Sequence, residues 1–225
     1  MALRLDDDLY AFLQGVFACS AEVASAIGAR AGERRYPPRA VIVQQGERGG
    51  ETWILIAGRA RALLYGAEGQ LVLLHEFASG DIFGAIAQAD AAPHDAEVVA
   101  VENVRAAFFL AMDFLSLIEL HSCVGLAVSR MLLKRLRETT ARMVERTTLS
   151  ASGRIHAELL RLARAANDGR TVRPAPVLAA MAVRVLSTRE TVSRTINALE
   201  RRGIIRREAD ALIVVAPHRL EEMVV

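Results

Sequence analysis

The chain of 225 residues is 52 % hydrophobic and 24 % charged, and its formal net charge is +2 at pH 7. This length exceeds the roughly 150 residues expected of one domain, so it predicts two compact units. No apolar run approaches the ~18 residues needed to cross a bilayer, and the opening stretch MALRLDDDLY is acidic. Both features favour a soluble cytosolic protein without a membrane partner.

The first half of the chain predicts an antiparallel sheet domain between about Val41 and Leu110. Glycine turns separate short β-prone runs in this segment, AVIVQQG, TWILIAGRARALLYG, QLVLLHEFASGD and VRAAFFLA. The runs lie too close together for intervening crossover helices. We therefore expect a β-roll or sandwich, and the fold class is α+β.

A single long helix is expected from Met112 to about Arg146, because this segment has no proline and its apolar residues fall at helical spacing. Within it, a 4-3-4 spacing is typical of the seam of a two-stranded coiled coil and predicts a homodimer. Packing of the helix on the sheet would explain the same stripe. The seam residues are Leu132, Leu136, Thr139 and Met143.

The last third predicts a winged helix-turn-helix. The small polar stretch TTLSASGR, residues 147–154, is expected to be a hinge. Beyond it, RIHAELLRLARAA, PVLAAMAVRVL and STRETVSRTINALERRG predict three short helices, and IIRRE and ALIVV around AD predict a hairpin. We place the domains at 1–112 (effector β-roll), 113–146 (dimerisation helix) and 147–225 (DNA binding).

Charge is distributed unequally along the chain. Residues 134–225 hold 18 Lys and Arg against 10 Asp and Glu, whereas the preceding part holds 10 against 16. A basic C-terminal part is expected of a protein that binds the phosphate backbone of DNA. A solvated basic surface would have the same composition.

The third short helix of this region has two distinct faces. Val192, Ile196 and Leu199 point one way, and a contiguous polar set points the other: Arg189, Glu190, Ser193 and Arg194. Arginine pairs with guanine O6 and N7, and glutamate accepts from cytosine N4, so this face can read bases. The sequence STRE is also typical of a capping box, with Ser187 at the N-cap. A cap alone gives no reason for arginines at the positive end of a helix.

These motifs carry a resemblance that covers nearly the whole chain. A β-roll with QQGE, IAGRA, AEGQ and SGDIFG, a long helix, SASGRI and the helix RETVSR resembles the CRP/FNR family of bacterial transcription regulators. The resemblance implies a cytoplasmic homodimer that binds a two-fold related DNA operator, with half-sites of TGTGA or TTGAT type, and RNA polymerase as a further partner. The DNA-binding residues implied are Ser187, Thr188, Arg189, Glu190, Ser193 and Arg194.

Two departures from the family pattern affect the turn and the effector site. Leu186 occupies the position before the recognition helix where the family usually has glycine. In the nucleotide-binding stretch, Ala85 replaces the ribose-binding glutamate and Asp95 replaces the phosphate-binding arginine, so we expect no switch by cyclic AMP. The effector pocket implied comprises Gly84, Ala85, Asp95, Ala96, Thr139 and Thr140, and a cyclic nucleotide would need another cation, Arg130 or Arg135.

Alternative effectors and functions stay open at this point. Cys19 and Cys123 are far apart in the sequence and form no cluster, which argues against a disulfide framework, a zinc site or an iron–sulfur site. His75 could ligate haem, but an ordinary histidine in a β-strand is the better interpretation. His94 with Asp95 and Glu97 could hold a metal, but an ordinary polar loop explains these three residues better. We expect no cofactor and no metal.

The alternative function is a β-roll module that senses a cyclic dinucleotide, haem or a small metabolite and whose helix-turn-helix serves protein contacts. An enzyme is disfavoured because the sequence has no GxxxxGK loop, nucleophile elbow or HExxH pair.

Overall fold

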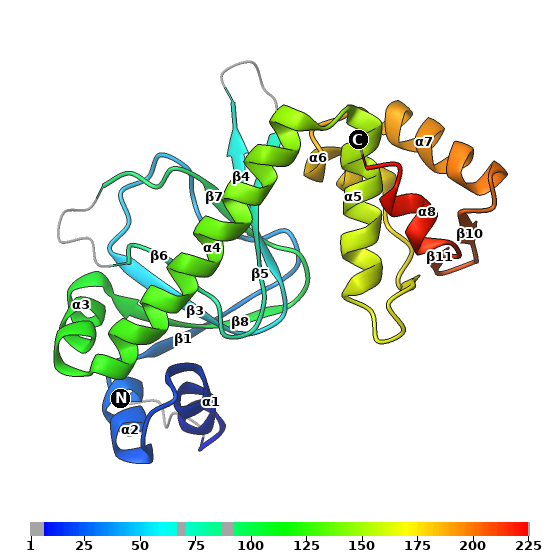
Figure 1. The fold of residues 1–225 in the computed structure, drawn as a ribbon. Helices are drawn as coiled ribbons and strands as arrows, with labels where there is room; N and C mark the ends of the chain where they lie inside the picture. Colours follow the sequence, from blue (N-terminus) through cyan, green and yellow to red (C-terminus); the bar gives the residue numbers. More distant parts are fainter. Residues whose placement is uncertain (1–6, 67–70, 87–91, 225) are drawn as a thin grey trace. The chain divides into compact units, whose positions relative to one another are not determined.

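The structure, a computed structural model, describes residues 7–66, 71–86 and 92–224 (Figure 1). Contacts divide the chain into an N-terminal unit, residues 1–136, and a C-terminal unit, residues 137–225. The boundary falls inside the long helix. The two units are therefore described one at a time.

The N-terminal unit contains two four-stranded antiparallel sheets, which confirms the predicted β-roll. The order of strands is β1-β8-β3-β6 in one sheet and β2-β7-β4-β5 in the other. The strands are β1 (Gly32–Tyr36), β2 (Val41–Val43), β3 (Glu51–Ala57), β4 (Ala60–Tyr65), β5 (Leu71–Phe77), β6 (Ile82–Gly84), β7 (Glu97–Ala100) and β8 (Val104–Leu110). Two helices precede them that the sequence analysis did not identify, α1 (Asp7–Phe17) and α2 (Ala21–Gly28).

Glycine is required at the turn that joins β3 to β4. Gly58 has φ +87°, and a Cβ atom there would lie 2.3 Å from the carbonyl oxygen of Asn103. The turn brings the two strands against opposite sides of one core, which contains Trp53, Leu55, Ala60, Phe77 and Phe83. Only a residue without a side chain can make this approach.

The expectation of one helix from Met112 to about Arg146 is wrong. The segment forms α3 (Ala111–Leu120) and α4 (Ser122–Thr148), which are bent by 110° at the extended residue His121. Without the bend, the two helices would form one straight helix about 57 Å long, from residue 111 to residue 148. The bend lets Phe114 and Leu117 of α3 and Val124 and Val128 of α4 enter the same buried cluster.

That cluster also brings the two cysteines together. The thiol of Cys19 interacts with that of Cys123, and burial, followed by this neighbour, raises the pKa of Cys19. Both cysteines are free and half-buried. Distance along the chain was therefore no guide to their distance in the fold.

The C-terminal unit has the predicted order of a winged helix-turn-helix. It contains α5 (Ala151–Arg164), α6 (Leu178–Arg184), α7 (Arg189–Arg201) and the hairpin of β10 (Ile205–Arg207) and β11 (Leu212–Val214). A short strand, β9 (Thr171–Val172), completes a three-stranded antiparallel sheet of order β10-β11-β9, and α8 (Pro217–Glu221) follows it. Neither β9 nor α8 was predicted.

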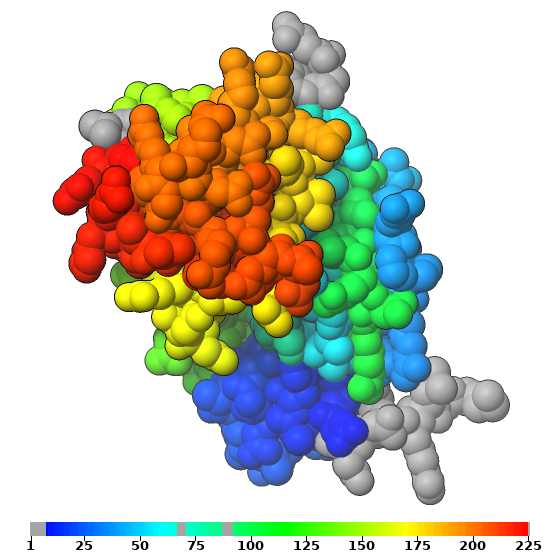
Figure 2. Space-filling view, turned by 90° about the vertical axis from the view of Figure 1, so that its right-hand side faces the viewer, coloured from blue at the N-terminus to red at the C-terminus, as the bar shows by residue number. Residues whose placement is uncertain are grey.

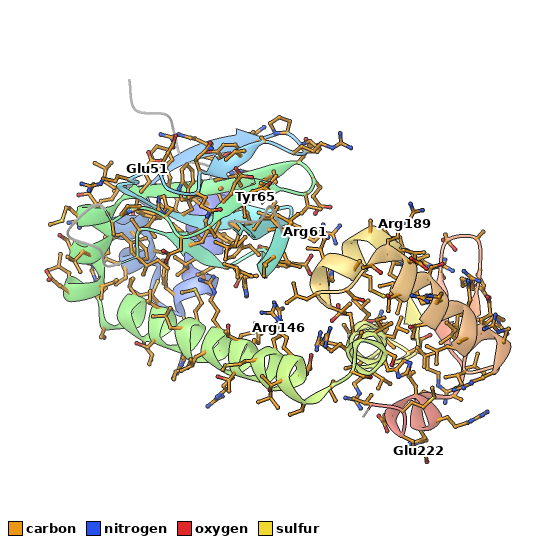
Figure 3. The ribbon with its side chains drawn as sticks, turned by 90° about the horizontal axis from the view of Figure 1, so that it is seen from above. Glu51, Arg61, Tyr65, Arg146, Arg189 and Glu222 are labelled. Atoms are coloured by element: carbon orange, nitrogen blue, oxygen red, sulfur yellow. The ribbon has the colours of Figure 1, made fainter. Side chains whose placement is uncertain are left out.

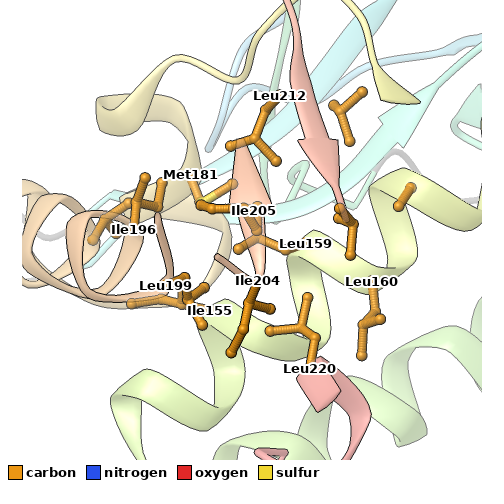
Figure 4. Close-up of a cluster of buried hydrophobic side chains, with 14 of the residues drawn as sticks. Ile155, Leu159, Leu160, Met181, Ile196, Leu199, Ile204, Ile205, Leu212 and Leu220 are labelled. Atoms are coloured by element: carbon orange, nitrogen blue, oxygen red, sulfur yellow. The ribbon is translucent and has the colours of Figure 1, made fainter. Parts of the chain in front are cut away.

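One apolar cluster holds this unit together (Figure 4). It takes side chains from every helix and strand of the winged fold, including Ile155, Met181, Ile196, Ile205 and Leu220.

The expected hinge of residues 147–154 is much shorter than predicted, because α4 continues to Thr148 and α5 begins at Ala151. Ser150 caps α5, and its hydroxyl accepts from the backbone N–H of Gly153 at 3.0 Å.

Among the described residues, no single helix combines the length and apolar content that crossing a membrane requires. Two bent pairs, α1 with α2 and α3 with α4, pass that test only when each pair is counted together.

Candidate DNA interface and effector pocket

The helix α7 is amphipathic in the way the sequence predicts. Val192, Ile196 and Leu199 are at most 1 % exposed and pack into the core of the C-terminal unit. The predicted N-cap is wrong by one residue, because the hydroxyl of Thr188, not that of Ser187, accepts from the N–H of Thr191 at 3.1 Å. Serine and threonine are both good caps, so the sequence does not separate them.

The opposite face of α7 is exposed and charged. Arg189 and Glu190 in the first turn and Arg194 one turn later lie on the surface, and Ser193 between them is half-buried. Figure 3 shows Arg189 at the start of the helix, and Figure 2 shows the surface of the orange segment to which α7 belongs. No ion pair joins Arg189 to another residue among those that the structure describes.

The one contact within this face is weak. A nitrogen of Arg194 lies 3.7 Å from an oxygen of Glu190, and the two side chains are 71 % and 77 % exposed. Such an exposed pair on one helix contributes about 0.3–0.5 kcal/mol. Both groups can therefore exchange this contact for hydrogen bonds to base edges.

The turn before α7 has an unusual backbone. Leu186, at the position where the family pattern has glycine, has φ +47° and lies in the left-handed region. The guanidinium of Arg154 on α5 donates to the carbonyl oxygens of Val185 at 2.8 Å and Leu186 at 3.2 Å. The sequence analysis missed this role of Arg154, because only the fold brings a residue of α5 to this turn.

The hairpin is attached to α7 by a second arginine. Arg207 on β10 donates to Asn197 at 2.9 Å and from Nε to Glu200 at 3.0 Å. The hydrogen bond from Arg207 lowers the pKa of Glu200 below its usual value. The helix ends at Arg201 with Arg202 as its C-cap, and the next residue, Gly203, has φ +67° and supplies the left-handed conformation expected after a helix C-terminus.

The N-terminal unit contains a cavity of about 210 Å³ next to the stretch that carries the family's nucleotide-binding motif. Most of the residues that line it are apolar, and the polar lining comes from Arg135, His94 and Asp95. Arg135 donates to the carbonyl oxygen of Ile82, and its guanidinium lies 5.1 Å from the ring centre of Phe77. The apolar lining consists of Val43, Ala62, Phe77, Phe83, Ile86, Pro93, Ala96 and Val98.

Three of the residues expected in the effector pocket line this cavity: Gly84, Asp95 and Ala96. Ala85 does not. It is 1 % exposed, its N–H donates to Glu51 at 2.9 Å, and its carbonyl oxygen accepts from the hydroxyl of Thr52 at 3.1 Å.

Thr139 and Thr140 lie on the part of α4 that belongs to the C-terminal unit, and both are exposed. Of the two cations named as replacements for the missing arginine, Arg135 lines the cavity, and Arg130 is exposed on α4.

His75 and His94, the two histidines considered as ligands, lie in a strand and in a loop and make contacts that are ordinary there. His75 is half-buried on β5, and its ring centre lies 4.8 Å from that of Phe77. His94 joins two loops, since its N–H donates to Glu47 at 2.9 Å and its carbonyl oxygen accepts from Gly46 at 2.8 Å. In the part of the chain that the structure describes, no three His, Cys, Asp or Glu side chains gather as metal ligands.

Comparison with known proteins agrees with this arrangement. The model of the cyclic nucleotide-binding domain matches residues 33–121, and that of the Crp-like helix-turn-helix domain matches residues 153–223. The cyclic AMP receptor protein of Thermus thermophilus is 29 % identical over 190 residues, which cover 84 % of this chain and 87 % of the relative.

Two solved structures share the fold. A CooA mutant from Carboxydothermus hydrogenoformans superposes with a TM-score of 0.79 at 19 % identity, covering 99 % of this chain and 98 % of the other. The c-di-GMP responsive regulator CLP of Xanthomonas campestris superposes with a TM-score of 0.73 at 19 % identity, covering 87 % and 99 %. With both domain types matched in the family's order, the chain belongs to the CRP/FNR family of DNA-binding transcription regulators.

Proposed function

We propose that the chain is a homodimeric regulator that reads a two-fold related DNA operator with TGA-containing half-sites. The exposed Arg189, Glu190 and Arg194 on the outer face of α7 carry this proposal. The guanine of TGA and the cytosine opposite it offer the partners that arginine and glutamate prefer in the major groove. Ser187, Thr188 and Ser193 lie beside these residues and are proposed to contact the operator as well.

The exposed face of α4 supports the homodimer. Six large apolar side chains on this one helix are 49–66 % exposed: Leu126, Leu132, Leu133, Leu136, Met143 and Val144. Isolated exposed apolar residues are common, but a row of them along one helix is typical of a surface that another helix covers. A second copy of α4 is the proposed partner, which agrees with the two-fold operator.

The cavity supports an effector other than cyclic AMP. Its volume of about 210 Å³ is below the roughly 300 Å³ at which pockets for drug-sized ligands begin. The carboxylate of Asp95 would repel a cyclic phosphate, and Ala85 has no group that bonds a ribose hydroxyl. We propose that the regulator binds its operator without cyclic AMP or responds to a smaller effector. A direct contact with RNA polymerase, in the cytoplasm, completes the proposed role.

Paired DNA titrations test the base-reading assignment. Alanine at Arg189 or at Arg194 should cost about 1–3 kcal/mol on a selected operator and relax the preference at one base pair. Binding to random DNA of equal length should change much less. Arg201→Ala, at the other end of α7, is the matched control and should leave the preference intact. Equal losses on operator and random DNA would show that the two arginines hold phosphates only.

A further inference from the structure

Arg154 connects two backbone segments of the C-terminal unit through three carbonyl oxygens. Its Nη1 donates to the carbonyl oxygen of Leu149 at 3.0 Å, its Nε to that of Val185 at 2.8 Å, and its Nη2 to that of Leu186 at 3.2 Å. Leu149 lies in the short break between α4 and α5, and the other two lie in the turn between α6 and α7. One guanidinium thus ties the end of the long helix to the start of the recognition helix.

The turn needs such support because of its sequence. Leu186 has φ +47°, a conformation that glycine adopts freely and leucine does not. The carbonyl oxygens of Val185, the C-cap of α6, and of Leu186 lie at the negative end of that helix, where a cation is a favourable donor. Ser187 and Thr188 follow directly, so the position of this turn sets where Arg189 begins α7.

A second set of contacts joins the same helices. Glu158 on α5 has a side chain only 5 % exposed, and it pairs with Arg161 of the same helix and with Arg184 of α6 at 3.2 Å. Arg161 in turn pairs with Glu145 of α4 at 2.7 Å. These ion pairs link α4 to α6, but none of them contacts the left-handed turn itself. The backbone closes the turn in part, since the N–H of Ser187 donates to the carbonyl oxygen of Ala182 at 2.9 Å, and Arg154 adds side-chain hydrogen bonds to the carbonyl oxygens of Val185 and Leu186.

We propose that Arg154 is a positioning residue for DNA reading. It holds the non-glycine turn at Leu186 and thereby fixes the position of the first turn of α7 relative to the end of α4. This inference rests on the proposed reading of bases by Arg189 and Arg194. It differs from a direct phosphate contact, in which the charge of Arg154 alone would matter. It also differs from a purely stabilising role, in which operator and random DNA would respond alike.

Three variants separate these possibilities. Arg154→Lys keeps the charge but cannot reach three carbonyls with a planar fork. Leu186→Gly places at this position a residue that adopts the left-handed conformation without strain. The double variant combines both changes. Arg164→Lys on the same helix, whose side chain is 67 % exposed and pairs with Glu221, is the matched control.

The measurement is fluorescence anisotropy of the full-length protein on a selected operator and on random duplex DNA, over a series of salt concentrations. Arg154→Lys should lower the ratio of operator to random affinity about 5- to 150-fold, the range of one good base contact, with random affinity and salt slope nearly unchanged. Leu186→Gly alone should keep the ratio. The double variant should recover most of it.

Several outcomes would overturn the proposal. They are an unchanged ratio in Arg154→Lys, an equal loss on both DNAs, or a double variant that recovers nothing. If Arg154→Lys does not fold, the double variant decides, because the proposal requires it to fold and to prefer the operator. Failure of the base-reading assignment would show differently: Arg189→Ala and Arg194→Ala would keep the ratio while Arg154→Lys still lowered it.

Discussion

Replacing Leu136 by glutamate should dissociate the dimer. Fully burying a leucine contributes about 1.5–3 kcal/mol, and Leu136 is 63 % exposed in the single chain, so covering it contributes about 1–2 kcal/mol per protomer. A two-fold interface contains the residue twice, which gives about 2–4 kcal/mol, or roughly a 30- to 1,000-fold rise in Kd. Burying a carboxylate adds a further cost, so this range is a lower bound.

Sedimentation equilibrium over a range of protein concentrations measures this effect. The parent protein should be a dimer at micromolar concentration, and Leu136→Glu should shift toward monomer. Leu120→Glu is the matched control, because Leu120 is 66 % exposed but lies on α3. A monomeric parent protein would refute the proposed use of α4. An equal loss of dimer in both variants would place the interface elsewhere.

Two further predictions concern ligand binding and pH. Calorimetric titration of ligand-free protein with cyclic AMP or cyclic GMP should give no micromolar binding, because loss of a charged partner costs about 3–5 kcal/mol; micromolar heats with nucleotide-dependent operator binding would contradict this and point to Arg135 as the phosphate partner. Hydrogen bonds from the side chain and N–H of Thr171 and the N–H of Arg170 lower the pKa of Asp168 from 3.8 to about 2. Since the folded pKa is depressed, the stabilisation is present above pH 4 and is lost as the pH falls toward 2. The melting temperature of Asp168→Ala should therefore lie below that of the parent at pH 7, and the gap should narrow below about pH 4; a gap independent of pH would show that the turn does not need the carboxylate's charge.

The recognition helix could be predicted because its burial follows its sequence period. Val192, Ile196 and Leu199 are apolar, and all three are buried. The same rule failed at His121, since the spacing of Phe114, Leu117, Val124 and Val128 also fits one straight helix, and no proline or glycine marks the bend. Local periodicity does not report where the chain must turn back onto its core.

Contacts between residues far apart in the chain could not be predicted from the sequence. Arg154 looks like an ordinary basic residue of an amphipathic helix, yet its partners at Val185 and Leu186 are some thirty residues away. Arg135 finds its partner, the carbonyl oxygen of Ile82, in the same way, 53 residues away. Their roles depend on three-dimensional packing, and a single sequence offers no pattern that encodes it.

Selection of bound sequences from a pool of random DNA duplexes tests most directly whether this chain is a two-fold symmetric reader of DNA. Purified protein without added nucleotide should enrich sites made of two inverted TGA-containing half-sites, whose centres lie about one helical turn apart. The Arg194→Ala variant, run in parallel, should lose preference at one base pair of each half-site. Enrichment of no sequence, or of a single half-site without a symmetric partner, would contradict the proposed dimeric operator reader.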